Sequence, residues 1–276
     1  MSDQSDLELN SHFPFGDNWA QYSKHVTDEH LMYAVNDLQR LLGVSTLVGK
    51  TFCDIGCGSG IHAVAAAKMG AKVTALDIDP ISTATAISLA KKFGVSHLLT
   101  VGNDSIFDHM LPKSHFDVVY SWGVLHHTGA MWKAIEEAIK LVSLSSEGVF
   151  AVALYRKTRL CSLWKIEKKF YNSSPKFIQV SIRIFMTTLM DVAHLLRLRS
   201  PLKVRSEYRK NRGMSHKHDI HDWLGGYPYE SVQDTELKKF LTERNFDLER
   251  SFLRFPDKIP MGIFGSGCDE YVFKRI

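Results

Sequence analysis

The sequence has few cysteines, no long apolar run and no recognisable secretion signal. Its 276 residues include no stretch of about 18 uncharged apolar residues, so it predicts no membrane-spanning helix. The N-terminus, MSDQSDLELNSHF, is polar and acidic and lacks the basic and then apolar pattern of a signal peptide. A hydrophobic fraction of 45% is ordinary for a soluble globular chain. We therefore expect a cytoplasmic protein that can bury a sizeable core.

The four cysteines do not form a metal-binding or disulfide framework. Cys53 and Cys57 have C-x-x-x-C spacing, but no second pair follows them, so the spacing alone does not predict a zinc site. Free thiols in a reducing compartment are the simpler interpretation.

One stretch, residues 50–79, carries most of the information: KTFCDIGCGSGIHAVAAAKMGAKVTALDID. The apolar run from Thr51 to Ile55 predicts a buried strand. Three glycines at alternate positions then predict a tight turn, and helical spacing of apolar residues begins at Ile61. A second strand ends at Asp77. The resulting βαβ unit has a glycine turn after its first strand and a carboxylate after its second.

This arrangement favours a nucleoside-type ligand. Glycines let the ligand lie against the main chain near a helix N-terminus, and the Asp77 carboxylate can accept two hydrogen bonds from a ribose diol. Asp54 can either hold the turn or receive an ammonium group. The alternative is a purely structural turn, with Asp77 capping the next element. The glycine turn, the helix and the distal acid together favour the ligand.

The spacing of the glycines separates two kinds of cofactor. A dinucleotide-binding turn reads G-x-G-x-x-G and holds a pyrophosphate. Here the pattern is D-x-G-x-G-x-G, and its acid would repel pyrophosphate but attract the amino group of a methionine moiety. Residues 50–155 resemble the class I S-adenosylmethionine-dependent methyltransferases. The resemblance implies S-adenosylmethionine as cofactor, with S-adenosylhomocysteine as the product, and an antiparallel last strand.

Strands alternate with helices up to residue 155, which predicts an α/β fold with a doubly wound, mostly parallel sheet. Two further strands near the C-terminus make seven. We expect an N-terminal segment and cap helix over 1–49, a Rossmann-like cofactor-binding core over 50–155, a basic helical insertion over 156–232, and a final helix with two strands over 233–276.

Polar and glycine residues that follow the strands are the candidate cofactor contacts. At the end of the third strand, the resemblance implies an acid that binds the adenine amine directly after Gly102. Asn103 occupies that place and Asp104 follows it, so the assignment is divided between them. The complete candidate set is Asp54, Gly56, Cys57, Gly58, Gly60, Asp77, Ile78, Asn103, Asp104, Trp122 and Gly123.

Two adjacent histidines, His126 and His127, follow the predicted fourth strand, Phe116–Ser121. Ligands bind beyond the carboxyl ends of such strands, and imidazole is a suitable general base near neutral pH. The alternative is that one histidine packs or caps a helix, since neighbouring side chains are not expected to face inward together. We favour His126 as the base, with His127 as the alternate.

The segment WGVLHH, residues 122–127, is similar to the ubiquinone-biosynthesis-type O-methyltransferases, and this implies a small-molecule acceptor methylated at oxygen. No N-P-P-Y-type segment occurs, so we expect no DNA substrate. A methyltransferase that modifies RNA and a non-catalytic cofactor-binding subunit remain alternatives.

Residues 156–217 contain 16 Lys or Arg and three acids. This basic segment is interpreted in four ways: a substrate cover, an anionic membrane surface, an RNA contact, or an ordinary solvated face.

Residues 212–230 are rich in His, Asp and aromatic residues and predict a constrained loop over the substrate, with a plain structural loop as the alternative. Their spacing matches no zinc template, so we expect no metal. Residues 13–22 predict an aromatic turn, which either covers the cleft or precedes a helix packed on the sheet edge. The candidate substrate contacts are Trp19, Tyr22, Tyr155, His218, Asp219, His221, Trp223 and Tyr227.

Overall fold

The computed structural model of the chain describes residues 15–204, 216–256 and 258–276, and the side chains of 216–219 lie outside the description. The chain divides into two compact units. The first comprises the described parts of residues 14–161 and 230–276, and the second lies within residues 162–229.

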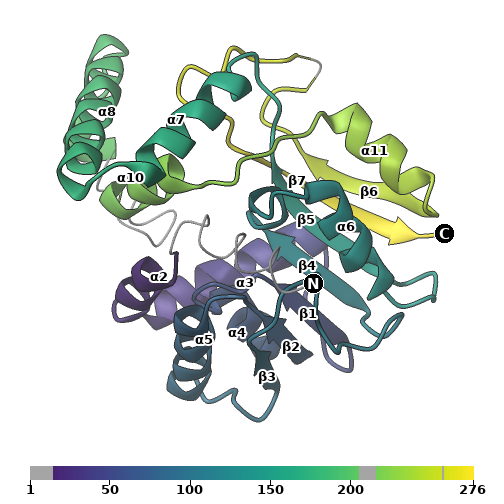
Figure 1. The fold of residues 1–276 in the computed structure, drawn as a ribbon. Helices are drawn as coiled ribbons and strands as arrows, with labels where there is room; N and C mark the ends of the chain where they lie inside the picture. Colours follow the sequence, from purple (N-terminus) through teal and green to yellow (C-terminus); the bar gives the residue numbers. More distant parts are fainter. Residues whose placement is uncertain (1–14, 205–215, 257) are drawn as a thin grey trace. The chain divides into compact units, whose positions relative to one another are not determined.

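The first unit is built on a seven-stranded sheet with the order β3-β2-β1-β4-β5-β7-β6 (Figure 1). Strands β1 to β5 are parallel, and β7 is antiparallel to both of its neighbours. The predicted fold is therefore confirmed, including the antiparallel last strand. The strands are β1 (Thr51–Ile55), β2 (Lys72–Leu76), β3 (Leu99–Gly102), β4 (Val118–Trp122), β5 (Val149–Tyr155), β6 (Phe246–Phe252) and β7 (Cys268–Arg275).

Helices cover both faces of this sheet, because alternate residues of each strand point to opposite faces. In β1, Phe52 packs into a core with the helices α3, α4 and α5, whereas Cys53 and Ile55 pack into a second core with α6 and α11. The helices of this unit are α2 (Phe15–Ser23), α3 (Asp28–Leu42), α4 (Ile61–Lys68), α5 (Pro80–Lys92), the short 3₁₀ helix η1 (Leu125–His127), α6 (Met131–Lys140) and α11 (Asp234–Thr242).

Two segments differ from the sequence expectation. The predicted aromatic turn over residues 13–22 contains a helix, α2, and the predicted loop over 212–230 contains another, α10 (His216–Gly225). In the second case, the buried residues Ile220 and Leu224 are four residues apart, which is a helical spacing. The Gly225-Gly226 pair therefore marks where the helix ends.

The second unit contains most of α7 (Cys161–Ser173), with α8 (Lys176–Leu196) and α10. Lys168 is fully buried, lies 5.1 Å and 5.5 Å from the ring centroids of Trp223 and Tyr229, and donates a hydrogen bond to the carbonyl of Trp223. The Tyr171 hydroxyl is 2.7 Å from Nδ1 of His221. Within the described residues, no helix is both long and apolar enough to span a membrane.

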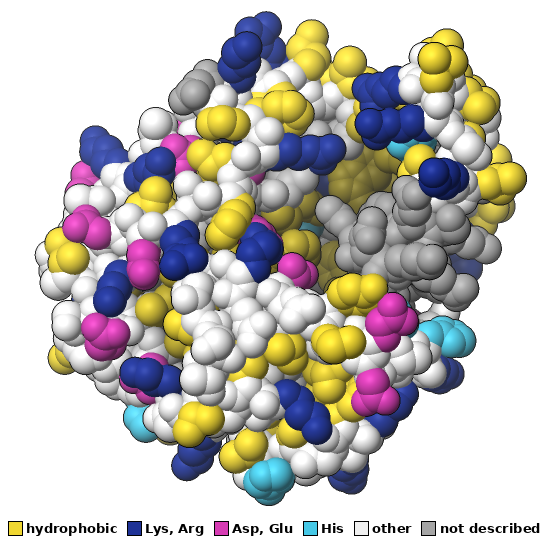
Figure 2. All heavy atoms as spheres, turned by 180° about the vertical axis from the view of Figure 1, so that it is seen from behind, with side chains coloured by type: hydrophobic (Ala, Val, Ile, Leu, Met, Phe, Trp, Pro, Cys, Tyr) yellow, Lys and Arg dark blue, Asp and Glu magenta, His cyan; other side chains and the backbone are white. Residues whose placement is uncertain are grey.

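The surface of α8 combines two kinds of side chain. Hydrophobic and basic side chains share the part of the surface where α8 lies, at the upper right of Figure 2. The exposed apolar residues of this helix are Phe177, Val180, Ile184, Phe185, Leu189, Val192, Leu195 and Leu196.

A buried ion pair links the end of β5 to β7 in the first unit. The Nε atom of Arg156 donates to Oδ2 of Asp269 at 2.5 Å, and both side chains are almost fully buried. The backbone N–H of Arg254 donates to the other oxygen of Asp269 at 3.1 Å. Asp269 on β7 therefore fixes two segments of the chain, the one that follows β5 at Arg156 and the one that contains Arg254.

Replacing Asp269 with alanine leaves the Arg156 guanidinium buried without its counter-ion. We expect Asp269→Ala to lower the free energy of unfolding by about 3–5 kcal/mol, measured by urea denaturation. The matched control is Glu147→Ala, which breaks the exposed pair with Lys274 and should cost less than about 1 kcal/mol. Equal losses in the two variants would contradict the structural role of the buried pair.

Candidate functional site

The glycine turn joins β1 to α4 at the carboxyl edge of the sheet. The backbone N–H groups of Gly56 and Cys57 donate to the carbonyl of Leu76, at 2.8 Å and 3.1 Å, and so tie the turn to the end of β2. Gly58 has a φ of 53°, in the left-handed region that favours glycine. The first strand, the turn and the distal acid are therefore brought together as the sequence predicts.

Neighbouring elements pack directly against the backbone of this turn. A Cβ atom added at Gly56 would lie 2.3 Å from Val124, in the loop after β4. A Cβ added at Gly58 would lie 3.1 Å from the indole of Trp19, in α2. The turn thus has space for a main chain but not for side chains, because the loop after β4 and α2 pack directly against it.

Helix α2 crosses the same edge of the sheet. The ring of Phe15 lies 5.7 Å from that of His127, and the N–H of Gly16 donates to Oδ2 of Asp79 at 2.9 Å. Trp19 then contacts the glycine turn, and the ring of Tyr22 lies 5.9 Å from the ring of Trp19. The segment is a helix and not a turn, and the predicted substrate contacts of Trp19 and Tyr22 stay predictions.

Asp77 lies directly after β2, and its carboxylate is held by the turn itself. Oδ2 accepts the N–H of Gly58 at 2.8 Å, and Oδ1 accepts the N–H of Asp79 at 2.9 Å. Burial raises the pKa of Asp77, and these two hydrogen bonds oppose the rise. Each carboxylate oxygen can accept more than one hydrogen bond, so Asp77 can still accept from a ribose hydroxyl.

Asp54 is buried within β1 and faces the first turn of α4. Burial and the charge of Asp77 raise the pKa of Asp54 to about 8, although a hydrogen bond from the backbone of Ala63 opposes the rise. Of the two roles considered from the sequence, this contact supports the one in which Asp54 holds the turn against α4.

The residues at the ends of β3 and β4 have different surroundings. The side-chain amide of Asn103 donates to the carbonyls of Asp77 and Ile78, at 2.9 Å and 3.0 Å, and so fixes the loop that carries the acid. The indole N–H of Trp122 donates to Glu270 on β7 at 2.9 Å. The predicted cofactor contact of Trp122 gains no support from this placement, whereas Asn103 lies directly beside the predicted ribose-binding acid.

Both histidines after β4 lie against Tyr155, which ends β5. The rings of His126 and His127 lie 4.0 Å and 5.2 Å from the ring of Tyr155, and 4.4 Å from each other. The expectation that neighbouring histidines cannot both face inward is therefore wrong. The 3₁₀ helix η1 is tighter than an α-helix and places both rings around one tyrosine.

The two histidines differ in access to solvent. His126 is fully buried, and its Nδ1 lies 3.4 Å from the backbone N–H of Tyr155, which donates to it. His127 retains 8% exposure and also contacts Phe15 of α2. This geometry favours His127 over His126 for contact with a substrate.

Glu230 is a site residue that the sequence did not single out. Its N–H donates to the carbonyl of His126 at 3.0 Å, and its carboxylate accepts the N–H of Met131 at 2.8 Å. Glu230 therefore fixes the histidine turn and caps α6. No local pattern in the sequence indicates this role, because Glu230 and Met131 are 99 residues apart.

The remaining candidate substrate residues belong to the second unit. His221 and Trp223 pack within that unit, against Tyr171 and Trp164 respectively. Tyr227 is half-buried, and the side chains of His218 and Asp219 lie outside the described residues. Among the side chains that the structure does describe, no group of three or more His, Cys, Asp or Glu is placed to hold a metal ion.

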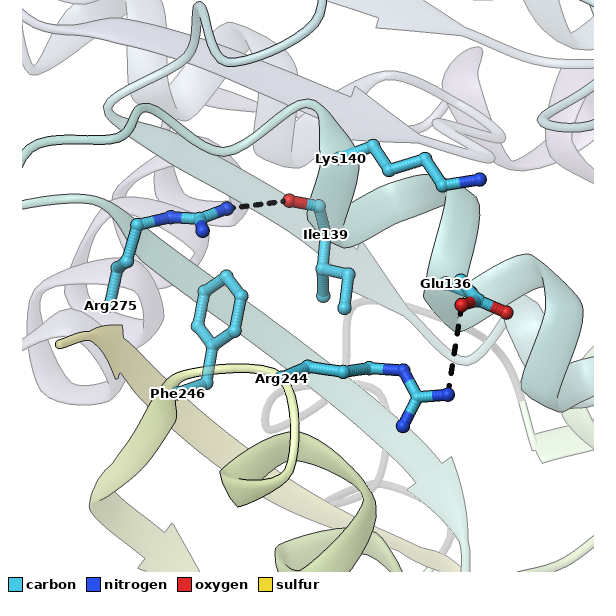
Figure 3. Close-up of a pocket in the computed structure, with 6 residues that line it drawn as sticks. All are labelled: Glu136, Ile139, Lys140, Arg244, Phe246 and Arg275. Carbon is cyan, nitrogen blue, oxygen red and sulfur yellow. Dashed lines mark hydrogen bonds and ion pairs between the residues drawn. The ribbon is translucent and has the colours of Figure 1, made fainter.

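A separate hollow of about 220 Å³ lies at the opposite end of the sheet (Figure 3). Arg275 points across it to the carbonyl of Ile139, at 3.2 Å, and Arg244 reaches Glu136, at 3.6 Å. Arg275 pairs with the start of β6, so this hollow is remote from the carboxyl edge that carries the glycine turn.

Comparison with known families identifies the fold. A profile described as "Methyltransferase domain" matches residues 47–224. The chain belongs to this family, and the class I S-adenosylmethionine-dependent methyltransferase prediction is confirmed at the level of family and fold. S-adenosylmethionine is the cofactor of the family.

Curated relatives match only parts of the chain. The ribosomal protein L11 methyltransferase of Photobacterium profundum is 52% identical over 56 residues, which cover 20% of this chain and 19% of that protein. The ubiquinone biosynthesis O-methyltransferase of a Methylobacterium strain is 31% identical over 117 residues, which cover 42% of this chain and 45% of that protein. The chain therefore spans from about a fifth to less than half of the length of these relatives.

A solved structure is similar over the whole chain. The magnesium protoporphyrin IX methyltransferase of Synechocystis PCC 6803, with bound S-adenosylmethionine, has a TM-score of 0.55 and 14% sequence identity, with coverage of 100% of this chain and 98% of that one. At this identity the similarity concerns the fold alone.

The glycine turn fits the family's cofactor. Its backbone carries no side chains at Gly56, Gly58 and Gly60, and the anchored Asp77 carboxylate can accept hydroxyl hydrogens. Asp77 and the Gly56–Gly60 turn are therefore the residues that would hold the nucleoside, with Asn103 fixing the acid loop.

The first site prediction concerns cofactor affinity. Asp77→Ala should weaken S-adenosylmethionine binding by about 1.5–3 kcal/mol, because hydrogen bonds to a charged group are lost. Gly58→Val should weaken it further, because the added side chain crowds Trp19 and the ligand space. The measurement is isothermal titration calorimetry.

The matched control for Gly58 is Gly94→Val. Gly94 also has a positive φ, 69°, but has no neighbour within 4 Å of an added Cβ. It should keep the wild-type affinity despite the same type of backbone strain. Unchanged affinity in both Asp77→Ala and Gly58→Val would reject this cofactor site.

The second site prediction concerns stability and pH. The folded pKa of Asp54, about 8, lies above the ordinary carboxyl value, so the folded state binds a proton that the unfolded state has lost. This contribution to stability is present at acidic pH and is lost as the pH rises through the interval up to about 8. Asp54→Asn keeps the neutral form, so its free energy of unfolding should fall less between pH 5 and pH 8 than that of the wild type.

Urea denaturation at the two pH values checks this expectation. Asp247→Asn, which changes an exposed carboxylate on β6, is the control and should keep the wild-type pH dependence. If Asp54→Asn shows the same fall as the wild type, Asp54 is ionised in the folded protein.

Proposed function

We propose that the protein transfers the methyl group of S-adenosylmethionine to an oxygen atom of a small-molecule acceptor. The proposal depends on the position of His127, a candidate general base. Its ring lies at the carboxyl edge of the sheet, between the rings of Tyr155 and Phe15 of α2. Its 8% exposure makes it the more accessible of the two histidines at that edge. The partial similarity to a ubiquinone biosynthesis O-methyltransferase also supports oxygen as the acceptor atom.

The bound cofactor supplies an electrophilic methyl group on a sulfonium. The chain's own residues have three tasks: Asp77 and the glycine turn hold the nucleoside, α2 covers the edge, and His127 accepts the proton that an acceptor hydroxyl loses. His126, the base favoured from the sequence, has the different task of supporting Tyr155. Alignment of the reacting groups lowers the barrier by up to roughly 7–11 kcal/mol. A general base accelerates the reaction about 10²–10⁴-fold, which corresponds to about 3–5 kcal/mol, so the base makes the smaller contribution.

The catalytic prediction separates the two histidines. His127→Ala should lower turnover by about 10²–10⁴-fold and leave S-adenosylmethionine affinity unchanged. Its turnover should also lose the fall at acidic pH, because a protonated imidazole cannot accept a proton. His126→Ala should mainly lower the free energy of unfolding, because it leaves a cavity beside Tyr155.

The assay follows a labelled methyl group from S-adenosylmethionine into a small-molecule extract and, separately, into RNA. His115→Ala, which changes an exposed histidine, is the control and should be fully active. Label in an O-methyl product supports the proposal, and label in RNA contradicts it. Tight cofactor binding with no labelled product in either pool would indicate a non-catalytic subunit.

A further inference from the structure

The outer side of α8 is an apolar face exposed to solvent. Phe177 and Leu196, near its two ends, are 71% and 81% exposed, and Ile184 and Phe185 between them are also exposed. Phe177, Ile184 and Leu195 are 7 and 11 residues apart in turn, so they lie on one stripe of the helix. We call the eight exposed apolar residues of α8 given above the α8 face.

The inner side of α8 packs within the second unit. Met186 is buried, and the side-chain amide of Gln179 donates to the carbonyls of Tyr171 and Ser174, at 3.0 Å and 3.1 Å. Met186 is the one buried residue of α8, and the α8 face lies on the opposite side of the helix. Contiguous exposed apolar surface of this kind marks an interaction site.

Basic residues flank the α8 face. Lys176 and Arg183 are seven residues apart and form a stripe beside the apolar one, and Arg197 and Arg199 follow the end of the helix. Asp191, the single acid within α8, lies seven residues after Ile184 and so on the apolar stripe, where it is half-buried. The helix therefore combines apolar side chains that can enter a non-aqueous phase with cations that attract negative charge.

We propose that the α8 face docks on the surface of an anionic lipid bilayer. A helix with one apolar side and flanking cations lies in the membrane interface with the apolar side among the acyl chains, and anionic headgroups attract the cations. An RNA-binding surface depends on cations that contact phosphates, whereas the α8 face itself is apolar. Pairing with a second copy would bury the apolar residues but would bring the like-charged flanks together.

This inference is independent of the proposed function, because it concerns a surface of the second unit and predicts binding without methyl transfer. The test uses the full chain in sedimentation with vesicles of phosphatidylcholine alone and of phosphatidylcholine mixed with phosphatidylglycerol. We expect binding to the mixed vesicles and little to the neutral ones. Binding should weaken as NaCl is raised, because the Debye length falls from about 10 Å at 0.1 M to about 3 Å at 1 M.

Variants test the apolar and the basic parts separately. Ile184→Asp and Leu196→Asp should each weaken binding to the mixed vesicles by about tenfold or more. Each variant loses the free energy gained when a leucine-sized side chain moves from water into the bilayer. Lys176→Glu combined with Arg183→Glu should reduce the preference for anionic vesicles. Met110→Asp is the matched control, because Met110 is an exposed apolar residue of the first unit, and it should bind as the wild type does.

Other outcomes would overturn the proposal. Equal binding to neutral and anionic vesicles, or vesicle binding that Ile184→Asp leaves unchanged, would remove the α8 face as the docking site. Absence of vesicle binding together with an RNA gel shift that Arg183→Glu abolishes would assign the segment to RNA. Absence of vesicle binding together with a dimer that Ile184→Asp dissociates would assign the face to a second copy of the chain.

Discussion

The close packing around the glycine turn is the constraint on which the rest of the site depends. The loop after β4 reaches Gly56 through Val124, α2 reaches Gly58 through Trp19, and α5 reaches Gly60 through Ala86. Each contact is possible only because the glycine has no side chain. The turn therefore fixes the position of the histidine loop and of α2 as well as the path of its own backbone. Substitution of one glycine affects a neighbouring element and not the turn alone.

The two carboxylates at this turn, Asp54 and Asp77, are buried next to each other. Burial raises the pKa values of both Asp54 and Asp77, and the charge of Asp77 raises that of Asp54 further. A ligand with positive charge would lower the cost of ionising both acids, whereas a pyrophosphate would increase it.

The sequence predicted most of the first unit, because its signals are local. The apolar run of β1, the three glycines and Asp77 lie within one βαβ unit, and parallel strands joined by short connections leave few possible topologies. Local pattern could not predict contacts that join distant segments. The Gly16–Asp79 hydrogen bond and the Glu230–Met131 cap each connect elements far apart in the chain. His126 was favoured as the base because the sequence does not show that Tyr155 encloses it.

The second unit shows why a count of charges is a weak guide to a partner. The basic excess alone is compatible with RNA, a membrane or a solvated face. Position distinguishes these possibilities: Lys168 is buried against Trp223 and Tyr229 and is therefore part of the packing, while Lys176 and Arg183 lie beside exposed apolar residues. A cation contributes to surface recognition only where it remains near solvent. Next to Phe177 and Ile184, the cations of α8 face the same phase boundary as the apolar side chains, and an anionic lipid surface is the environment that satisfies both.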